Sequence, residues 1–84
     1  MKKAIITFRS ITPAQRAESA LLREGFSCGI QRTPRWMEEL GCGYSVALEL
    51  RELDTCVQIL RRLQIPFKKL YLLRDNGAAE ELSL

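Results

Sequence analysis

The sequence predicts an α+β protein with a ferredoxin-like βαββαβ fold, a two-layer sandwich in which two helices cover one face of a four-stranded antiparallel sheet. Four segments alternate apolar and polar residues as strands do, and two segments repeat apolar residues every three or four positions as helices do. At 84 residues the chain has room for one domain. We expect this domain to span residues 1–73 and a C-terminal tail to span residues 74–84.

The four predicted strands differ in the regularity of their alternation. They cover residues 3–9 (KAIITFR), 26–31 (FSCGIQ), 44–50 (YSVALEL) and 67–73 (FKKLYLL). The third segment alternates most regularly, which predicts a central strand. The fourth carries Lys68 and Lys69, and lysines are typical of an edge strand that is protected from pairing with another chain.

The first helix is predicted over residues 13–24 from the residues at its two ends. Thr12 is a suitable N-cap, and Gln15 three residues later completes a capping box. Pro13 suits the first helical position because it lacks a backbone N–H. Gly25 is expected to end the helix in a left-handed conformation.

The second helix is predicted over residues 52–64, where apolar residues recur at helical spacing. Arg61 and Arg62 fall in its last turn, where cations suit the negative end of the helix dipole. In the tail, Asn76-Gly77 predicts a turn, and we expect one helical turn after it. The predicted core contains Leu21, Val46, Leu48, Val57 and Leu60.

The composition is that of an ordinary globular protein. Hydrophobic residues make up 46% of the chain and charged residues 27%, which argues against disorder and against a membrane span. The amino-terminal apolar run ends at Arg9 without a small-residue cleavage site, so we expect a cytoplasmic protein rather than a secreted one. The net charge of +3 is only mildly basic and does not by itself indicate a phosphate-binding surface.

The chain has three cysteines and no histidine. An odd number of cysteines without a CxxC pair favours reduced thiols over a disulfide framework. Without histidine there is no Cys-His or Ser-His pair, and a zinc site lacks ligands, so we expect neither a metal nor a cofactor. Cys28 and Cys56 lie on the apolar faces of a predicted strand and helix and are expected to be small buried hydrophobes.

Cys42 differs from the other two because it lies between Gly41 and Gly43, in the predicted loop between the second and third strands. The βαββαβ topology brings this loop to the same end of the sheet as the start of the first helix and the end of the second. Cations there and the helix N-terminus would stabilise a thiolate. The arginines expected within reach of the sulfur are Arg9, Arg32, Arg35, Arg61 and Arg62.

Four groups of residues form a recognisable pattern: Thr7-Phe8 with Ser10 and Thr12; Ala14, Ala17, Glu18 and Leu21; Thr33-Pro34-Arg35; and Gly41-Cys42-Gly43. With this pattern the chain resembles a family of small bacterial proteins described as selenium/sulfur carrier-like. The resemblance spans about residues 5–71. It implies a βαββαβ-like fold, a cytoplasmic setting and a role in handling selenium or sulfur on Cys42.

On this interpretation Cys42 is the thiol carrier, which receives sulfur or selenium as a persulfide from a donor protein and passes it to an acceptor protein. The residues expected to bind the ligand around it are Arg9, Ser10, Thr12, Thr33, Arg35, Gly41 and Gly43. Arg35 is equally consistent with a solvated turn residue. The chain lacks the usual general bases near Cys42, so we expect a carrier or accessory protein rather than a stand-alone catalyst.

Two other classes of function remain open. A non-catalytic protein-interaction module would use the open sheet face or an edge, where Ile5, Ala47 and Tyr71 could support a homodimer. A small-anion-binding module would instead use the end of the sheet with Cys42, Arg35 and the start of the first helix. An RNA-binding domain shares this element order, and GYSVAL resembles the third-strand motif of such domains. The exposed face of that strand, however, lacks a pair of aromatic residues on which bases could stack, so we do not expect nucleic-acid binding.

Overall fold

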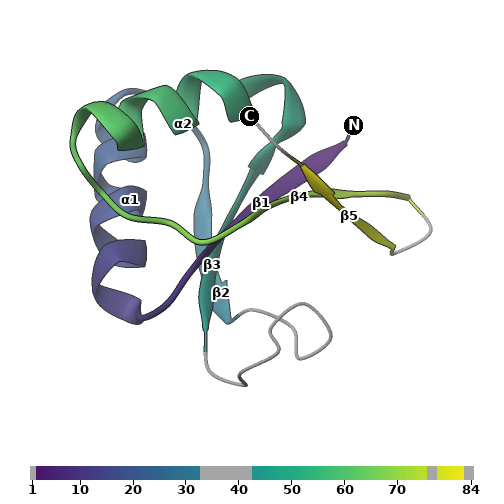
Figure 1. Ribbon diagram of the computed structural model, residues 1–84. Helices are drawn as coiled ribbons and strands as arrows, with labels where there is room; N and C mark the ends of the chain where they lie inside the picture. Colours follow the sequence, from purple (N-terminus) through teal and green to yellow (C-terminus); the bar gives the residue numbers. More distant parts are fainter. Residues whose placement is uncertain (1, 33–42, 76–77, 83–84) are drawn as a thin grey trace.

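The structure, a computed structural model, describes residues 2–32, 43–75 and 78–82 and consists of two layers (Figure 1). The elements in chain order are β1 (Lys3–Phe8), α1 (Ile11–Arg23), β2 (Gly29–Arg32), β3 (Tyr44–Glu49), the short 3-10 helix η1 (Leu50–Glu52), α2 (Leu53–Arg62), β4 (Leu70–Leu73) and β5 (Ala79–Leu82). The strands form one antiparallel sheet in the order β2-β3-β1-β4-β5, and α1 and α2 lie on the same side of it (Figure 1).

The predicted α+β class and the βαββαβ order are confirmed, but the sheet has five strands rather than four. The additional strand, β5, pairs antiparallel with β4, so β4 is not the edge strand that its lysines suggested. The helical turn expected in this region was wrong, because residues 79–82 are extended. The physical reason is that Asn-Gly between two extended segments favours a β-hairpin, and the backbone N–H of Arg74 donates to the carbonyl of Ala78 across it (2.8 Å).

The core lies between the helices and one face of the sheet. All five predicted core residues are at most 1% exposed, which confirms the alternation assigned to β3 and the helical spacing assigned to α1 and α2. On α1 the buried positions are three alanines and one leucine, Ala14, Ala17, Ala20 and Leu21. Small side chains on this face let the helix backbone approach the sheet closely.

The start of α1 differs from the prediction. The helix begins at Ile11 with Ser10 as N-cap, so Thr12 is not the cap and Pro13 is the third helical residue. Proline is tolerated there because no residue in the first turn of a helix has an intrahelical partner for its N–H. The Ser10 hydroxyl makes no capping hydrogen bond to the helix.

Both helices end in the same backbone motif, with one difference in sequence. After α1, Gly25 has a φ of +94° as predicted, and the N–H of Phe26 donates to the carbonyl of Leu21 (3.0 Å). After α2, Gln64 has a φ of +57°, and the N–H of Ile65 donates to the carbonyl of Leu60 (2.9 Å). Each is a Schellman turn, in which a left-handed residue ends the helix. The second helix is therefore shorter than predicted, because residues 63–64 already belong to the turn.

Candidate functional site

One end of the sheet carries both attachment points of the segment that contains Cys42. Tyr44 at the start of β3 pairs with Phe8 at the end of β1 and with Arg32 at the end of β2. Residues 33–42 join Arg32 to Gly43, and α1 begins three residues after Phe8. The residues on either side of this segment therefore lie at the same end of the sheet as the start of α1. We call this end of the sheet the attachment end.

Four of the predicted site residues belong to the described part of the chain. Arg9 and Ser10 are exposed between β1 and α1, Thr12 is exposed in the first turn of α1, and Gly43 is buried directly before β3. The other four, Thr33, Arg35, Gly41 and Cys42, lie outside the described residues.

The described groups at the attachment end give it a positive electrostatic character. Arg9 follows β1, and the guanidinium of Arg32 lies over the ring of Tyr44 with its carbon 5.7 Å from the ring centroid. The first turn of α1 contains no acidic residue. Because the first N–H groups of a helix have no intrahelical partner and carry the positive end of its dipole, this end favours an anion such as a thiolate.

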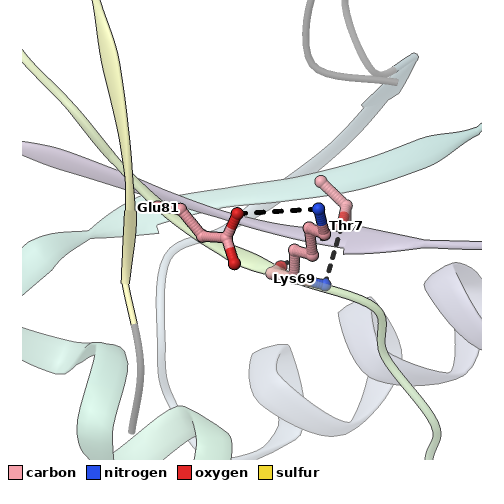
Figure 2. A network of polar contacts seen from close by, with 3 residues as sticks. All are labelled: Thr7, Lys69 and Glu81. Atoms are coloured by element: carbon pink, nitrogen blue, oxygen red, sulfur yellow. Dashed lines mark hydrogen bonds and ion pairs between the residues drawn. The ribbon is translucent and has the colours of Figure 1, made fainter. Parts of the chain in front are cut away.

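Thr7 holds β4 against this end of β1 (Figure 2). The N–H of Lys68 donates to the carbonyl of Thr7 (2.7 Å), while the N–H of Thr7 donates to the carbonyl of Lys69 (2.9 Å). Two residues of one chain segment thus oppose one residue of β1, which is a β-bulge. The Thr7 hydroxyl accepts from the N–H of Lys69 (3.0 Å) and donates to its carbonyl (3.2 Å). The side chain of Thr7 therefore completes the hydrogen bonding that the bulge interrupts.

Arg61 and Arg62, at the C-terminal end of α2, were both expected near Cys42, but the structure places Arg62 elsewhere. The guanidinium of Arg62 lies 3.9 Å from the carboxylate of Glu24, which directly follows the last turn of α1. Arg62 is thus beside the C-terminal end of α1 rather than its N-terminus, and its expected proximity to the site was wrong. The guanidinium of Arg61 lies over the ring of Phe67, at 5.9 Å from the centroid. The reason is that residues 63–69 run from the end of α2 across α1 before β4 begins (Figure 1).

The two described cysteines lie in surroundings that oppose thiolate formation. Cys56 is fully buried in the core, and burial, followed by the charges of Glu52 and Cys28, raises its pKa from the ordinary 9.0 to about 12. Cys28 is half-buried; burial, followed by the carboxylates of Glu18 and Glu52, raises its pKa as well. Both side chains therefore remain protonated at neutral pH and are poor nucleophiles. The predicted burial is confirmed for Cys56, whereas Cys28 is only half-buried.

Glu18 has a structural role that the sequence analysis did not identify. Its carboxylate accepts a hydrogen bond from the backbone N–H of Ile30 (3.1 Å), which ties α1 to β2 at the edge of the sheet. This contact also satisfies a strand N–H that the pairing with β3 leaves open. Glu18 directly follows the buried Ala17 on α1. This position did not distinguish it from an ordinary exposed carboxylate.

A comparison with known protein families shows the family of this chain. The sequence model of the family described as “Putative Se/S carrier protein-like” matches residues 3–72. The chain belongs to this family. The match begins at β1 and ends within β4, so β5 lies beyond the matched range in this member of the selenium/sulfur carrier-like family. No curated protein matches the sequence.

Two other kinds of site are absent from the described residues. Across 2–32, 43–75 and 78–82, neither helix has the length and apolar character that a membrane crossing requires. Within the same residues, no three side chains of histidine, cysteine, aspartate or glutamate are grouped so that they could hold a metal ion.

Proposed function

We propose that this protein is a selenium or sulfur carrier that holds the transferred atom on Cys42 and exchanges it with donor and acceptor proteins. The match to the selenium/sulfur carrier-like family over residues 3–72 is the observation that carries this proposal. The surroundings of the other two cysteines add to it. A carrier needs an accessible thiolate, and the raised pKa values of Cys28 and Cys56 make these thiols unsuitable.

The transfer chemistry balances without a cofactor. The Cys42 thiolate attacks the terminal sulfur of a donor persulfide, a new S–S bond forms at Cys42, and the donor's own sulfur leaves as a thiolate. An acceptor thiolate then attacks the terminal sulfur on Cys42, and the Cys42 thiolate leaves. The sulfur atom moves with no net oxidation or reduction, and selenium follows the same steps as a selenopersulfide.

The attachment end supplies what these steps require of the protein. Positive charge from Arg9 and the start of α1 would stabilise both the attacking and the leaving thiolate of Cys42. The hydroxyls of Ser10 and Thr12, with Thr33 and Arg35, would bind the terminal anionic atom by hydrogen bonds. Gly41 would leave space for the thiol of a partner to approach, whereas Gly43 is buried before β3. In this arrangement the protein acts as a cytoplasmic carrier and not as a stand-alone enzyme.

The alternative of a homodimer through the open sheet face receives little support. Ile5, the central residue of the predicted patch, is only 2% exposed, so little of its side chain is available to a second copy. Ala47 and Tyr71, its direct neighbours on β3 and β4, are half-buried. The area that pairing would bury there is correspondingly small.

Intact-mass spectrometry after treatment with a low-molecular-weight persulfide tests the proposal. The wild-type protein should gain the mass of one sulfur atom, which a reductant should remove. Cys42→Ser should gain none, while Cys28→Ser should gain the same mass as the wild type. Retention of the added sulfur by Cys42→Ser would refute the proposal.

A further inference from the structure

A groove runs along the outer side of α1, between this helix and the segment that follows α2. It encloses about 430 Å³, and residues of both elements line it. In Figure 1 the segment after α2 crosses α1 on its way to β4, which accounts for the two walls. Thr12, at the start of α1, also lines the groove, so the groove extends to the attachment end.

The apolar part of the groove comes from the Schellman turn after α2. The left-handed residue Gln64 reverses the chain, so that Ile65 turns inward and is 4% exposed. Leu63, on the other side of the turn, is 43% exposed and is one of two large hydrophobic side chains left open in the described residues. Ala20 of α1 is 7% exposed beside them. The groove therefore has a shallow apolar floor with an exposed leucine at its margin.

The charged part of the groove comes from Arg16 and Arg23 of α1. Arg23 lies seven positions after Arg16, so both are on one side of the helix, about 10.5 Å apart along its axis. Both side chains are exposed, and neither forms an ion pair with another residue that the structure describes. Among the residues that the structure describes, no acidic side chain lines the groove. Two cations two helical turns apart, with an apolar site between them, are complementary to carboxylates of similar spacing on either side of an apolar side chain.

We propose that this groove binds an acidic segment of a partner protein, with carboxylates on Arg16 and Arg23 and an apolar side chain against Leu63. Identification of this partner as the donor or acceptor of sulfur or selenium rests on the proposed function. Because Thr12, which lines the groove, lies in the first turn of α1, a partner bound along the groove would extend to the attachment end. The groove would then bring the thiols of the two proteins together.

Peptide binding to the Cys42→Ser protein tests the groove without any thiol chemistry at Cys42. The probe is a fluorescent peptide of alternating glutamate and leucine, measured by anisotropy. The variant Arg16→Glu/Arg23→Glu should bind it at least about tenfold more weakly, since two attractive charge pairs are replaced by two repulsive ones. The control Lys2→Glu/Arg51→Glu makes the same change in net charge near the end of β3, away from the groove, and should bind within about twofold of the parent.

Two further measurements distinguish the contribution of charge to peptide binding from that of the apolar contact. Leu63→Gln keeps every charge and should weaken binding about fivefold, because an apolar contact is lost. A peptide with glutamine in place of glutamate should not bind. Equal loss in the groove and control double variants, or full binding by Leu63→Gln, would overturn the proposal. If the groove binds the peptide but Cys42 accepts no sulfur, the proposed carrier function is wrong and the proposed groove is supported. If Cys42 accepts sulfur but the groove binds no peptide, the proposed groove is wrong and the carrier function is supported.

Discussion

The two ends of the sheet offer opposite surroundings to a cysteine. Toward the end where β3 leads into η1, Cys28 and Cys56 are packed with apolar residues, and burial raises the pKa of both thiols. The carboxylate of Glu52 raises both pKa values further, and that of Glu18 adds to the shift of Cys28. The attachment end has Arg9, Arg32 and an α1 first turn without acidic residues. The same side chain is therefore a core hydrophobe at one end and a candidate nucleophile at the other, and its environment decides which.

The largest expected effect concerns the core end. Cys56→Ser should lower the free energy of unfolding by about 1–3 kcal/mol, because it places a hydroxyl in a fully buried apolar site. Cys28→Ser should cost less, since Cys28 is only half-buried. Urea denaturation followed by circular dichroism measures both. The distinction between the two ends would be broken if Cys56→Ser were as stable as the wild type, or if it lost the ability to take up sulfur while still folded.

A second prediction concerns how the attachment end is held together. Thr7→Val should cost about 1–2 kcal/mol, because the N–H of Lys69 loses the hydroxyl that accepts its hydrogen bond. Ser45 is the matched control: it pairs directly with Thr7 and is equally buried, but its hydroxyl has no hydrogen-bond partner among the described residues. Ser45→Ala should therefore leave the free energy of unfolding unchanged or raise it. Equal costs for the two variants would contradict the role assigned to the Thr7 hydroxyl.

A third prediction uses the dependence of stability on pH. Cys56 has a higher pKa in the folded protein, about 12, than its ordinary 9.0, so above pH 9 the unfolded chain loses a proton that the folded chain keeps. The stability of the folded state should fall as pH rises through this window, by up to about 1.4 kcal/mol per pH unit from this thiol. Cys56→Ala should show a shallower decline between pH 9 and 10.5 in urea titrations. Parallel declines in the two proteins would show that Cys56 titrates normally.

The smallest expected effect compares the ends of the two helices. Gln64→Gly should raise the free energy of unfolding by about 0.5 kcal/mol, because glycine adopts a left-handed conformation without the cost that a side chain incurs. Gly25→Ala should lower it by about 1 kcal/mol: a Cβ would meet no atom within 4 Å, so the cost is conformational and not steric. Thermal melts of both variants give the comparison. A destabilising Gln64→Gly would mean that the glutamine side chain stabilises the turn.

The sequence was sufficient for the parts of the fold that depend on regular patterns. Alternation in β3 and helical spacing in α1 and α2 identified buried core residues, and Gly25 identified the end of α1. It was insufficient for β5, whose four residues AEEL contain two glutamates and no β-branched residue.

The position of Arg62 could not be derived either, because it depends on where α2 ends and on the path of residues 63–69 across α1. Gln64 did not indicate that α2 ends before it, since glutamine is an ordinary helix-forming residue. At the attachment end, topology predicted which strand ends meet, whereas the bulge at Thr7 depends on hydrogen bonds that no local pattern encodes.

The pH dependence of alkylation, measured for each cysteine by peptide mapping of the native wild-type protein, tests the central claim most directly. Cys42 should react with iodoacetamide with a midpoint below that of a free cysteine measured under the same conditions, because positive charge at the attachment end is expected to stabilise its thiolate. Arg9→Glu/Arg32→Glu should shift that midpoint upward, while Cys28 and Cys56 should stay unreactive at neutral pH in both proteins. A midpoint for Cys42 at or above that of free cysteine, unchanged by the arginine substitutions, would contradict the account.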